Sequence, residues 1–361
     1  MSSVVTRSID RRASVEERAP RARVLDGLGV VLFLTAAAWM LWAAARSGGS
    51  AAPAIGLIVV GGLVLVTARM VASHVRVLVP MAALIAAIIV AARSRTGVVS
   101  TAPLSGPLEY INADGAFYVQ AAIAGLMVAS MGRSTLVRAV GFLGAGFFAA
   151  LPFIVHAAAA AWLVLVLPSV ALASVLLTGG RGPRASVALF ALFFVASLTA
   201  SILLGSTYSK TAHKSVFQRA AMKAVDEDRL LLWRDAFVIM RDHPETGVGP
   251  RRYQVVSPIG SKDPDYRWAH NEFLQQGAET GIAGLAILAA FFLWGFARLW
   301  AVRAPGAVTA LGAASLAALG IHSCVDYVMH FPAIPLITAG LVGAAMIDGN
   351  ERDLPKSAGA T

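Results

Sequence analysis

The chain has 361 residues, of which 57% are hydrophobic and only 14% charged. Soluble domains carry about 25% charged residues, so a composition this apolar, with a mean hydropathy of +0.71, argues against a water-soluble globular enzyme. The net charge of +10 does not indicate nucleic-acid binding, because the basic residues lie between apolar segments and form no continuous face. The single cysteine, Cys324, excludes an intramolecular disulfide and a cysteine metal cluster.

Residues 1–27 form a polar tail with six arginines, and residues 28–45 follow it without a charge. A secretory signal is one interpretation of this start, since Ala43, Ala44 and Ala45 resemble a cleavage site. The length of the basic leader and the many apolar segments that follow favour a first membrane span instead.

Ten segments approach the 17–25 or so apolar residues that a transmembrane helix needs. They are residues 28–45, 51–68, 77–92, 116–131, 139–155, 157–178, 185–205, 273–297, 306–328 and 332–348. Residues 139–178 are divided at His156, because forty apolar residues containing Pro152 and Pro168 exceed one crossing of a core about 30 Å thick. The sequence therefore predicts an all-α polytopic membrane bundle, with seven spans in 28–205 and three in 271–348.

The short loops between these spans indicate the orientation of the chain. If the N-terminus is cytoplasmic, sixteen basic residues lie in inner segments, and only Arg46, Arg93 and Arg95 lie in short outer loops. This bias satisfies the positive-inside rule. We therefore expect both tails, residues 1–27 and 349–361, in the cytoplasm and the long loop of residues 206–270 outside.

The long loop, residues 206–270, is the only sizeable polar region, with eleven basic and eight acidic residues. It is too short and too charged to build a substantial core of its own, so we expect it to lie across the outer mouth of the bundle. One stretch before Pro244 has helical periodicity, and its apolar face comprises Leu232, Trp233, Ala236, Phe237 and Met240. This pattern predicts an amphipathic helix at the membrane interface, followed by a tight turn at Gly247-Val-Gly249-Pro250.

His270 lies where this loop meets the eighth span. The imidazole of histidine titrates near neutral pH, which suits it to accept a proton from a hydroxyl group. Four arginines of the loop could hold a phosphate or pyrophosphate, because the guanidinium fork matches phosphate oxygens; they are Arg229, Arg251, Arg252 and Arg267. Interfacial arginine and histidine side chains also commonly bind lipid headgroups, so simple membrane anchoring is an open alternative from spacing alone.

Charged residues inside the spans are costly in hydrocarbon, so we expect them to face the bundle interior or a water-filled mouth. They include Glu279 in the eighth span, and His322 and Asp326 in the ninth. His322 and Asp326 are four residues apart on one helix face, so a pair with each other is one interpretation. The spacing of His, Cys, Asp and Glu fits no zinc motif, and the glycines fit neither a dinucleotide fingerprint nor a P-loop. No metal or cofactor is therefore expected.

Five short motifs follow one another in the second half of the chain. They are Arg229-x-x-x-Trp233, Asp242-His243-Pro244, Gly247-x-Gly249, His270-Asn271-x-x-Leu274 and Glu279-x-Gly281. In this order they resemble the O-antigen ligase and O-antigen polymerase superfamily, membrane glycosyltransferases that act on undecaprenyl-pyrophosphate-linked glycans. Tyr110-x-Asn112 and His322-Ser-x-x-Asp326 agree more loosely with family patterns. The resemblance is strong over about residues 226–347 and faint before them.

The resemblance implies that His270 is the base that activates the acceptor hydroxyl and that Arg229 is a pyrophosphate ligand. The wider set of candidate substrate-binding residues is Arg251, Arg252, Arg267, Asn271, Glu279, Tyr110, Asn112, His156, His322 and Asp326. The implied donor is an undecaprenyl-pyrophosphate-linked glycan, and the implied acceptor is a glycan or a molecule of the lipid-A-core type. The implied location is the bacterial inner membrane with the active site on its outer side and membrane lipids around it.

One family feature is missing from the chain. Members usually carry Ser-Arg-Gly at the outer start of a middle span, where its arginine contacts the donor, and this place falls on residues 154–157 here. Three interpretations follow: His156 substitutes for the arginine, Arg229 holds the pyrophosphate together with Arg251 or Arg252, or catalysis is altered.

The expected function is thus transfer of a glycan from the lipid carrier to a sugar hydroxyl, as a ligase or as a polymerase. A transporter or flippase of lipid-linked sugars is an alternative, in which His322, Asp326 and Glu279 would form a proton or substrate path. No inverted repeat or pair of interrupted helices is evident in the sequence, which disfavours it. A non-catalytic scaffold in the cell envelope is the third possibility.

Overall fold

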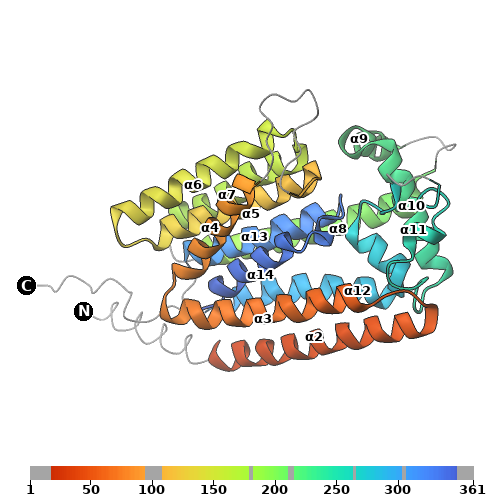
Figure 1. Cartoon of the computed structure of the whole chain (residues 1–361), viewed down its shortest axis with the longest axis horizontal. Coiled ribbons are helices and arrows are strands. Elements are labelled where there is room, and N and C mark those ends of the chain that lie inside the picture. The colour runs from red at the N-terminus through yellow and green to blue at the C-terminus, as the bar shows by residue number, and fades with distance from the viewer. Residues whose placement is uncertain are drawn as a thin grey trace, which may run out of the picture.

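The computed structural model describes residues 18–93, 108–178, 182–209, 215–262, 266–302 and 306–347, and every regular element among them is helical (Figure 1). In chain order the elements are α2 (Arg18–Ser47), α3 (Ala52–His74), α4 (Leu78–Arg93), α5 (Ile111–Met131), α6 (Thr135–Ile154), α7 (Ala158–Thr178), α8 (Gly182–Thr207), α9 (Val216–Val225), α10 (Glu227–Asp242), α11 (Tyr253–Val256), α12 (Glu272–Trp300), α13 (Ala307–Ser323), the 3-10 turn η3 (Val328–His330) and α14 (Ala333–Ala345). The predicted all-α class is confirmed.

Seven of these helices are long and apolar enough to cross a membrane: α2, α3, α5, α6, α7, α8 and α12. Three more, α4, α13 and α14, are apolar but shorter. Each of the ten overlaps one of the segments expected from hydropathy, and the three shorter helices do not reach the length of a span. The predicted division near His156 is confirmed, because α6 ends at Ile154 and α7 begins at Ala158. The chain is a multi-pass helical bundle.

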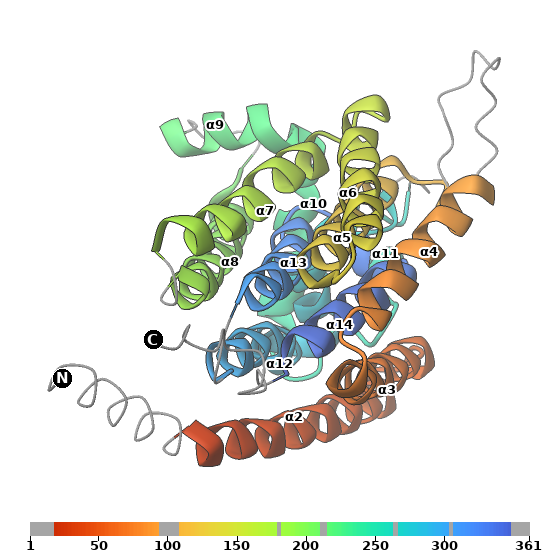
Figure 2. The ribbon, with the colours of Figure 1, turned by 90° about the vertical axis from the view of Figure 1, so that its left-hand side faces the viewer.

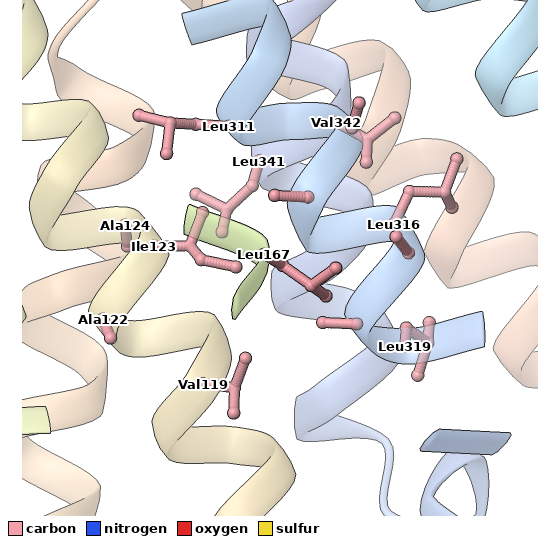
Figure 3. Packing of buried hydrophobic residues seen from close by; sticks show 14 of the residues in the cluster. Val119, Ala122, Ile123, Ala124, Leu167, Leu311, Leu316, Leu319, Leu341 and Val342 are labelled. Carbon is pink, nitrogen blue, oxygen red and sulfur yellow. The ribbon is translucent and has the colours of Figure 1, made fainter. Parts of the chain in front are cut away.

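The centre of the bundle is formed by α5 and α13, which the other helices surround (Figure 2). Their side chains interdigitate, with Ile123 of α5 facing Leu311 of α13 and Leu341 of α14 (Figure 3). Small residues let α5 approach α6 closely: a Cβ added at Gly125 would lie 2.6 Å from the backbone nitrogen of Ala145. Close packing of small residues is typical of helix pairs in membranes, where burial of apolar surface gives no drive for association.

The outer helices keep large apolar side chains on their surface. Leu176 is 82% exposed, and the same holds to a lesser degree for Leu34, Leu63, Leu143 and Leu192. A soluble monomer rarely exposes so much contiguous apolar surface. A helix that is apolar on its outer face as well as its inner face is instead suited to a lipid surrounding.

The turn between α2 and α3 and the region between α8 and α12 meet at one end of the bundle, which we call the loop end. There Arg252 donates through Nη1 to the carbonyl oxygen of Ser47 (2.6 Å), and the amide of Ser50 donates to the carbonyl of Pro250 (3.1 Å). The opposite end brings α2, α3 and α12 together through Asp26, whose Oδ1 binds Arg69 (2.8 Å) and Arg298 (2.7 Å).

Helix α10 corrects one expectation. Its apolar side, which includes Leu232, Trp233, Ala236 and Met240, is buried against protein, mainly α8 and α12, so it is not presented to a membrane interface. Phe237, predicted on the same face, is only partly buried. The predicted amphipathic pattern is present, but α8 and α12 supply the apolar surface that lipid was expected to supply.

The turn after α10 joins that helix to α12. Gly247 (φ 60°) and Gly249 (φ 101°) have left-handed backbones, and the amides of Val248 and Gly249 donate to the carbonyls of Ala278 (3.0 Å) and Glu279 (2.9 Å). These carbonyls are available because α12 is interrupted at Gly281, which has φ 76°. The predicted tight turn is confirmed, and it packs against α12 at the point where that helix is interrupted.

Replacing Gly247 with alanine should destabilise this junction. A Cβ at Gly247 would overlap the carbonyl oxygen of Ala278, and a positive φ is unfavourable for alanine, so we expect a loss of about 1–3 kcal/mol. The measurement is the thermal unfolding midpoint of the purified protein in detergent. Gly56→Ala in α3 is the matched control, since nothing lies within 4 Å of its Cβ position. An equal midpoint for both variants would contradict the role given to Gly247.

Candidate functional site

Asp326 is the centre of the candidate site, and it lies outside the helix in which it was predicted. Helix α13 ends at Ser323, so the ninth apolar segment is shorter than the expected 306–328. The amide of Asp326 donates to the carbonyl of His322 (2.9 Å) in the turn that follows. The predicted pair between the His322 and Asp326 side chains is therefore wrong, because the chain leaves the helix before Asp326 and turns its carboxylate elsewhere.

Donors from four separate parts of the chain surround the Asp326 carboxylate, which is completely buried. They are Tyr110 Oη (2.8 and 2.9 Å), Asn112 Nδ2 (2.6 Å), the Tyr327 amide (2.8 Å), Arg229 Nη1 (3.3 Å) and His270 Nδ1 (3.3 Å). A buried charge is tolerated only when it is paired and hydrogen-bonded. The number of donors shows how this carboxylate stays ionised.

Arg229 comes from the first turn of α10. Asp226 caps that helix, accepting from the Arg229 amide (2.9 Å), and also pairs with Arg229 Nε (3.4 Å). At its other end Arg229 Nη1 donates to the carbonyl oxygen of Val325 (2.6 Å). The side chain is 20% exposed, so one part of it is fixed by the protein and another part is accessible.

His270 is held by its backbone on both sides. Trp233 donates through Nε1 to the carbonyl oxygen of His270 (3.0 Å), and the next residue, Asn271, caps α12 by accepting from the Leu274 amide (3.0 Å). Asn271 also donates through Nδ2 to the carbonyl of Cys324 (2.6 Å). His270 itself has φ 49°, a strained conformation that persists only where the surroundings enforce it. The imidazole is thus aimed at Asp326 by α10, α12 and the end of α13 together.

The electrostatics of the cluster favour a charged carboxylate beside a neutral phenol. Burial acts to raise the pKa of Asp326, but the hydrogen bond from His270 and the charge of Arg229 outweigh it and hold that pKa well below its ordinary value. Burial and the negative charge of Asp326 raise the pKa of Tyr110 above its ordinary value, so its hydroxyl stays a donor. An ionised carboxylate only accepts hydrogen bonds, so Nδ1 of His270 carries the proton and Nε2 is left as the basic nitrogen.

Three predicted residues lie beside the cluster rather than in it. Glu279 is buried and accepts from the amides of Arg251 (2.7 Å) and Tyr253 (3.3 Å), so it holds the turn before α11 in place. Arg252 is engaged with the carbonyl of Ser47. The Arg251 side chain is exposed, with a positive φ of 62° at its backbone.

The remaining predicted residues are not brought into contact with the Asp326 carboxylate by the described bonds. His156 is exposed in the turn between α6 and α7. Arg267 is exposed and lies close enough to Tyr327 for its charge to act on the pKa of that phenol. His322 is buried in α13, and within the described part of the chain neither ring nitrogen has a hydrogen-bond partner.

Sequence reasoning missed a second imidazole next to the cluster. His330 of η3 binds Glu272, the first residue of α12, through Nδ1 (3.2 Å). The ring of Tyr327 lies between the two histidines, with ring centroids 4.8 Å from His270 and 5.7 Å from His330. The ring of Trp268 packs on the imidazole of His330, with ring centroids 4.3 Å apart. The spacing of residues along the chain does not indicate a pair between residues 330 and 272. The only signal in the sequence is that both residues lie next to apolar segments.

No known protein-family model matches the chain, and no curated protein matches it.

Proposed function

We propose that the protein is a membrane glycosyltransferase that transfers a glycan from an undecaprenyl-pyrophosphate carrier to a sugar hydroxyl, in the manner of the O-antigen ligases and polymerases that its motifs resemble. The observation that carries the proposal is the contact between His270 Nδ1 and the buried Asp326 carboxylate (3.3 Å). A carboxylate that fixes the tautomer of a histidine and stabilises its protonated form is the arrangement used by general bases in acyl transfer.

The reaction follows from this pair. His270 Nε2 takes the proton of the acceptor hydroxyl while its oxygen attacks the anomeric carbon of the donor sugar. The bond between that carbon and the phosphate oxygen breaks, and undecaprenyl pyrophosphate leaves with the electron pair. Asp326 stabilises the imidazolium that forms. Asp326 is thus a positioning residue, and His270 is the catalytic one.

Arg229 is assigned to the departing pyrophosphate. Its Nη1 and Nε are engaged by Asp326, Val325 and Asp226, so we assign Nη2 to a phosphate oxygen. Charge on the leaving group grows in the transition state, and a fixed cation is worth most there. Pyrophosphate is already a good leaving group, so the proposed reaction needs no metal ion.

We further propose that all ten apolar helices span a bacterial inner membrane, with the loop end outside and both termini in the cytoplasm. The bias of basic residues supports this orientation. The loop end holds α9, α10, α11 and the Asp326 cluster, so the active site would face the compartment outside the cytoplasm.

A transporter of lipid-linked sugars is the second candidate, because α12 is interrupted at Gly281. Discontinuous helices in transporters usually occur as a related pair around a central substrate site. Here the residues at the break in α12 are used to dock the turn at Gly247, which favours a structural role for the interruption.

The direct test is glycan transfer by the purified full chain in lipid nanodiscs. With an undecaprenyl-pyrophosphate-linked glycan and a sugar acceptor, we expect release of undecaprenyl pyrophosphate together with an elongated acceptor, at a rate unchanged by EDTA. If no undecaprenyl pyrophosphate is released with any acceptor while the donor moves across the bilayer, the protein is a transporter and the transferase proposal is wrong.

Topology is tested separately by cysteine labelling in intact cells. Ser261 is exposed at the loop end and Ser73 is exposed at the end of α3, while the native Cys324 is buried and contributes little background. We expect Ser261→Cys to react with an impermeant maleimide and Ser73→Cys to react only after the cells are opened. The reverse pattern would invert the proposed orientation.

A further inference from the structure

Four aromatic side chains lie together at the loop end, beside the proposed catalytic pair. The ring of Tyr110 is stacked on Tyr327 and on Phe331, with ring centroids 4.9 and 5.7 Å apart. The ring of Trp268 lies 6.1 Å from that of Tyr327. None of the four side chains is fully buried, so this group, which we call the aromatic cluster, keeps part of its surface accessible.

The aromatic cluster borders a cavity. The cavity has a volume of about 570 Å³ and lies between α2 and α3 on one side and α12, α13 and α14 on the other (Figure 2). Trp268, Tyr327 and Phe331 line it at the loop end. Small-molecule sites are typically lined in this way, by aromatic side chains with a few polar groups among them.

The charged groups at this end of the cavity balance one another. Two carboxyl groups, Glu272 and Glu279, lie there with two basic side chains, Arg251 and His330. Burial acts to lower the pKa of His330, but the charge and hydrogen bond of Glu272 outweigh it and raise that pKa above its ordinary value. The imidazole is therefore a cation paired with a carboxylate. With no surplus of positive charge, this end of the cavity suits a neutral polar ligand better than an anion.

Two polar atoms beside the aromatic cluster have no hydrogen bond to any residue that the structure describes. Glu272 binds His330 through Oε2 (3.2 Å), which leaves Oε1 without a partner. Trp268 Nε1 is also unpartnered within the described ranges, whereas Trp233 donates through Nε1 to the carbonyl oxygen of His270. A ligand in the cavity is thus offered one acceptor and one donor next to an aromatic ring.

A sugar ring in the pyranose form has the complementary chemistry. One of its faces is covered by C–H groups, which pack on the electron-rich face of an aromatic ring. Its hydroxyl groups project from the edge and both donate and accept hydrogen bonds. An indole ring beside a carboxylate oxygen and an N–H donor therefore matches a neutral pyranose better than it matches a hydrocarbon chain or a phosphate.

The position of Trp268 relates this chemistry to the proposed base. Trp268 lies two residues before His270, so their Cα atoms are within about 7 Å of each other. The ring of Tyr327 contacts that of His270, with centroids 4.8 Å apart. A sugar packed on the indole of Trp268 would have its hydroxyl groups at the distance of one aromatic ring from the imidazole.

We propose that Trp268 is the platform on which the acceptor sugar packs. Its pyranose ring stacks on the indole, Glu272 Oε1 accepts from one of its hydroxyl groups, and the attacking hydroxyl lies at His270 Nε2. This inference rests on the proposed function and adds the residue that positions its acceptor. The acceptor at this subsite is a neutral pyranose with one unsubstituted C–H face.

Binding is tested without any donor, by saturation-transfer NMR on the full chain in lipid nanodiscs. The probes are methyl β-galactoside, methyl β-glucoside and methyl α-mannoside. We expect at least one probe to receive saturation, most strongly at the protons of its C–H face. Trp268→Leu keeps an apolar side chain but no aromatic face, so this signal should fall about tenfold, whereas Trp268→Phe should retain most of it.

Trp162→Ala is the control for this experiment, because Trp162 is 70% exposed on α7 and lies outside the cavity. Its signal should equal that of the parent protein. If no probe receives saturation from the parent protein, the proposal is wrong. Equal signals from the parent protein and Trp268→Leu would also overturn it and would leave Trp268 as an anchor at the membrane interface.

Kinetics separate an acceptor subsite from a donor subsite. Trp268→Leu should raise the KM for the acceptor sugar about tenfold and leave both kcat and the KM for the lipid-linked donor unchanged. Trp268→Phe should restore the KM of the parent protein. A rise in the donor KM with an unchanged acceptor KM would overturn the assignment.

Failure of the subsite and failure of the proposed function have different signatures. Saturation that depends on Trp268, with no glycan transfer by the parent protein to any acceptor, would leave the sugar subsite standing and remove the transferase. Transfer by the parent protein, with the same acceptor KM in Trp268→Leu, would do the reverse.

Discussion

The His270→Ala variant should lose about 10²–10⁴-fold in kcat for glycan transfer, with little change in the KM for the lipid-linked donor. The reason is that a positioned general base contributes a factor of this size, while the imidazole is not assigned to binding of the lipid. The measurement is the rate of undecaprenyl pyrophosphate release from a purified donor in lipid nanodiscs.

The matched control for this variant is His74→Ala. His74 is exposed at the end of α3 and, among the residues that the structure describes, bonds only with Met70 and Ser73 of its own helix, so its loss should leave the rate unchanged. Full activity of His270→Ala in the same assay would remove the proposed base and the mechanism with it. A parallel drop for both histidines would point to damage of the fold instead.

The Asp326→Asn variant should lower kcat for glycan transfer as much as His270→Ala does, and it should also lower the free energy of unfolding. An amide at residue 326 no longer requires the proton on Nδ1 of His270, and it removes the charged partner of Arg229 Nη1, leaving Arg229 paired only with Asp226 among the described residues. We expect kcat to fall about 10²–10⁴-fold and the free energy of unfolding to fall by on the order of 3 kcal/mol. Asp242→Asn is the control, because Asp242 is exposed and, within the described ranges, is paired only with the neighbouring Arg241.

The pH dependence of stability separates this role from simple loss of packing. The pKa of Asp326 is lowered in the folded protein, and its value in an unfolded chain is about 3.9. The stabilisation by its charge is therefore complete above that pH and is lost as the pH falls from about 4 toward the lower folded value. The unfolding midpoints of the parent protein and Asp326→Asn should thus differ most at neutral pH and converge in acid. A constant difference across this range would contradict the charge-based role.

Two histidines of the site are each paired with a carboxylate, His270 with Asp326 and His330 with Glu272. In the proposed reaction His270, paired with Asp326, removes the acceptor proton, whereas His330 is paired with Glu272 and takes no part in that step. Tyr327 separates them. The absence of an arginine at residues 154–157 is compatible with the proposed reaction, because Arg229 supplies positive charge beside Asp326.

Much of the architecture was predictable because hydropathy is a local property. Ten apolar segments, the break near His156 and the turn at Gly247 all follow from a few consecutive residues. The same is true of the helix that became α10, since its periodicity requires no knowledge of its neighbours. What that helix packs against was not predictable, and α12 and α8, not lipid, cover its apolar face.

The sequence by itself determined the all-helical class, the apolar segments, the polar loop and a set of candidate residues that included both His270 and Asp326. Only the tertiary structure decided that Tyr110, Arg229 and His270 surround the carboxylate of Asp326, which lies up to 216 residues away from them in the sequence. It also decided that α13 stops at Ser323, which turns Asp326 away from His322. The physical reason is that burial and pairing of a charge depend on which helix ends meet in space, and residue spacing along the chain carries no record of that meeting.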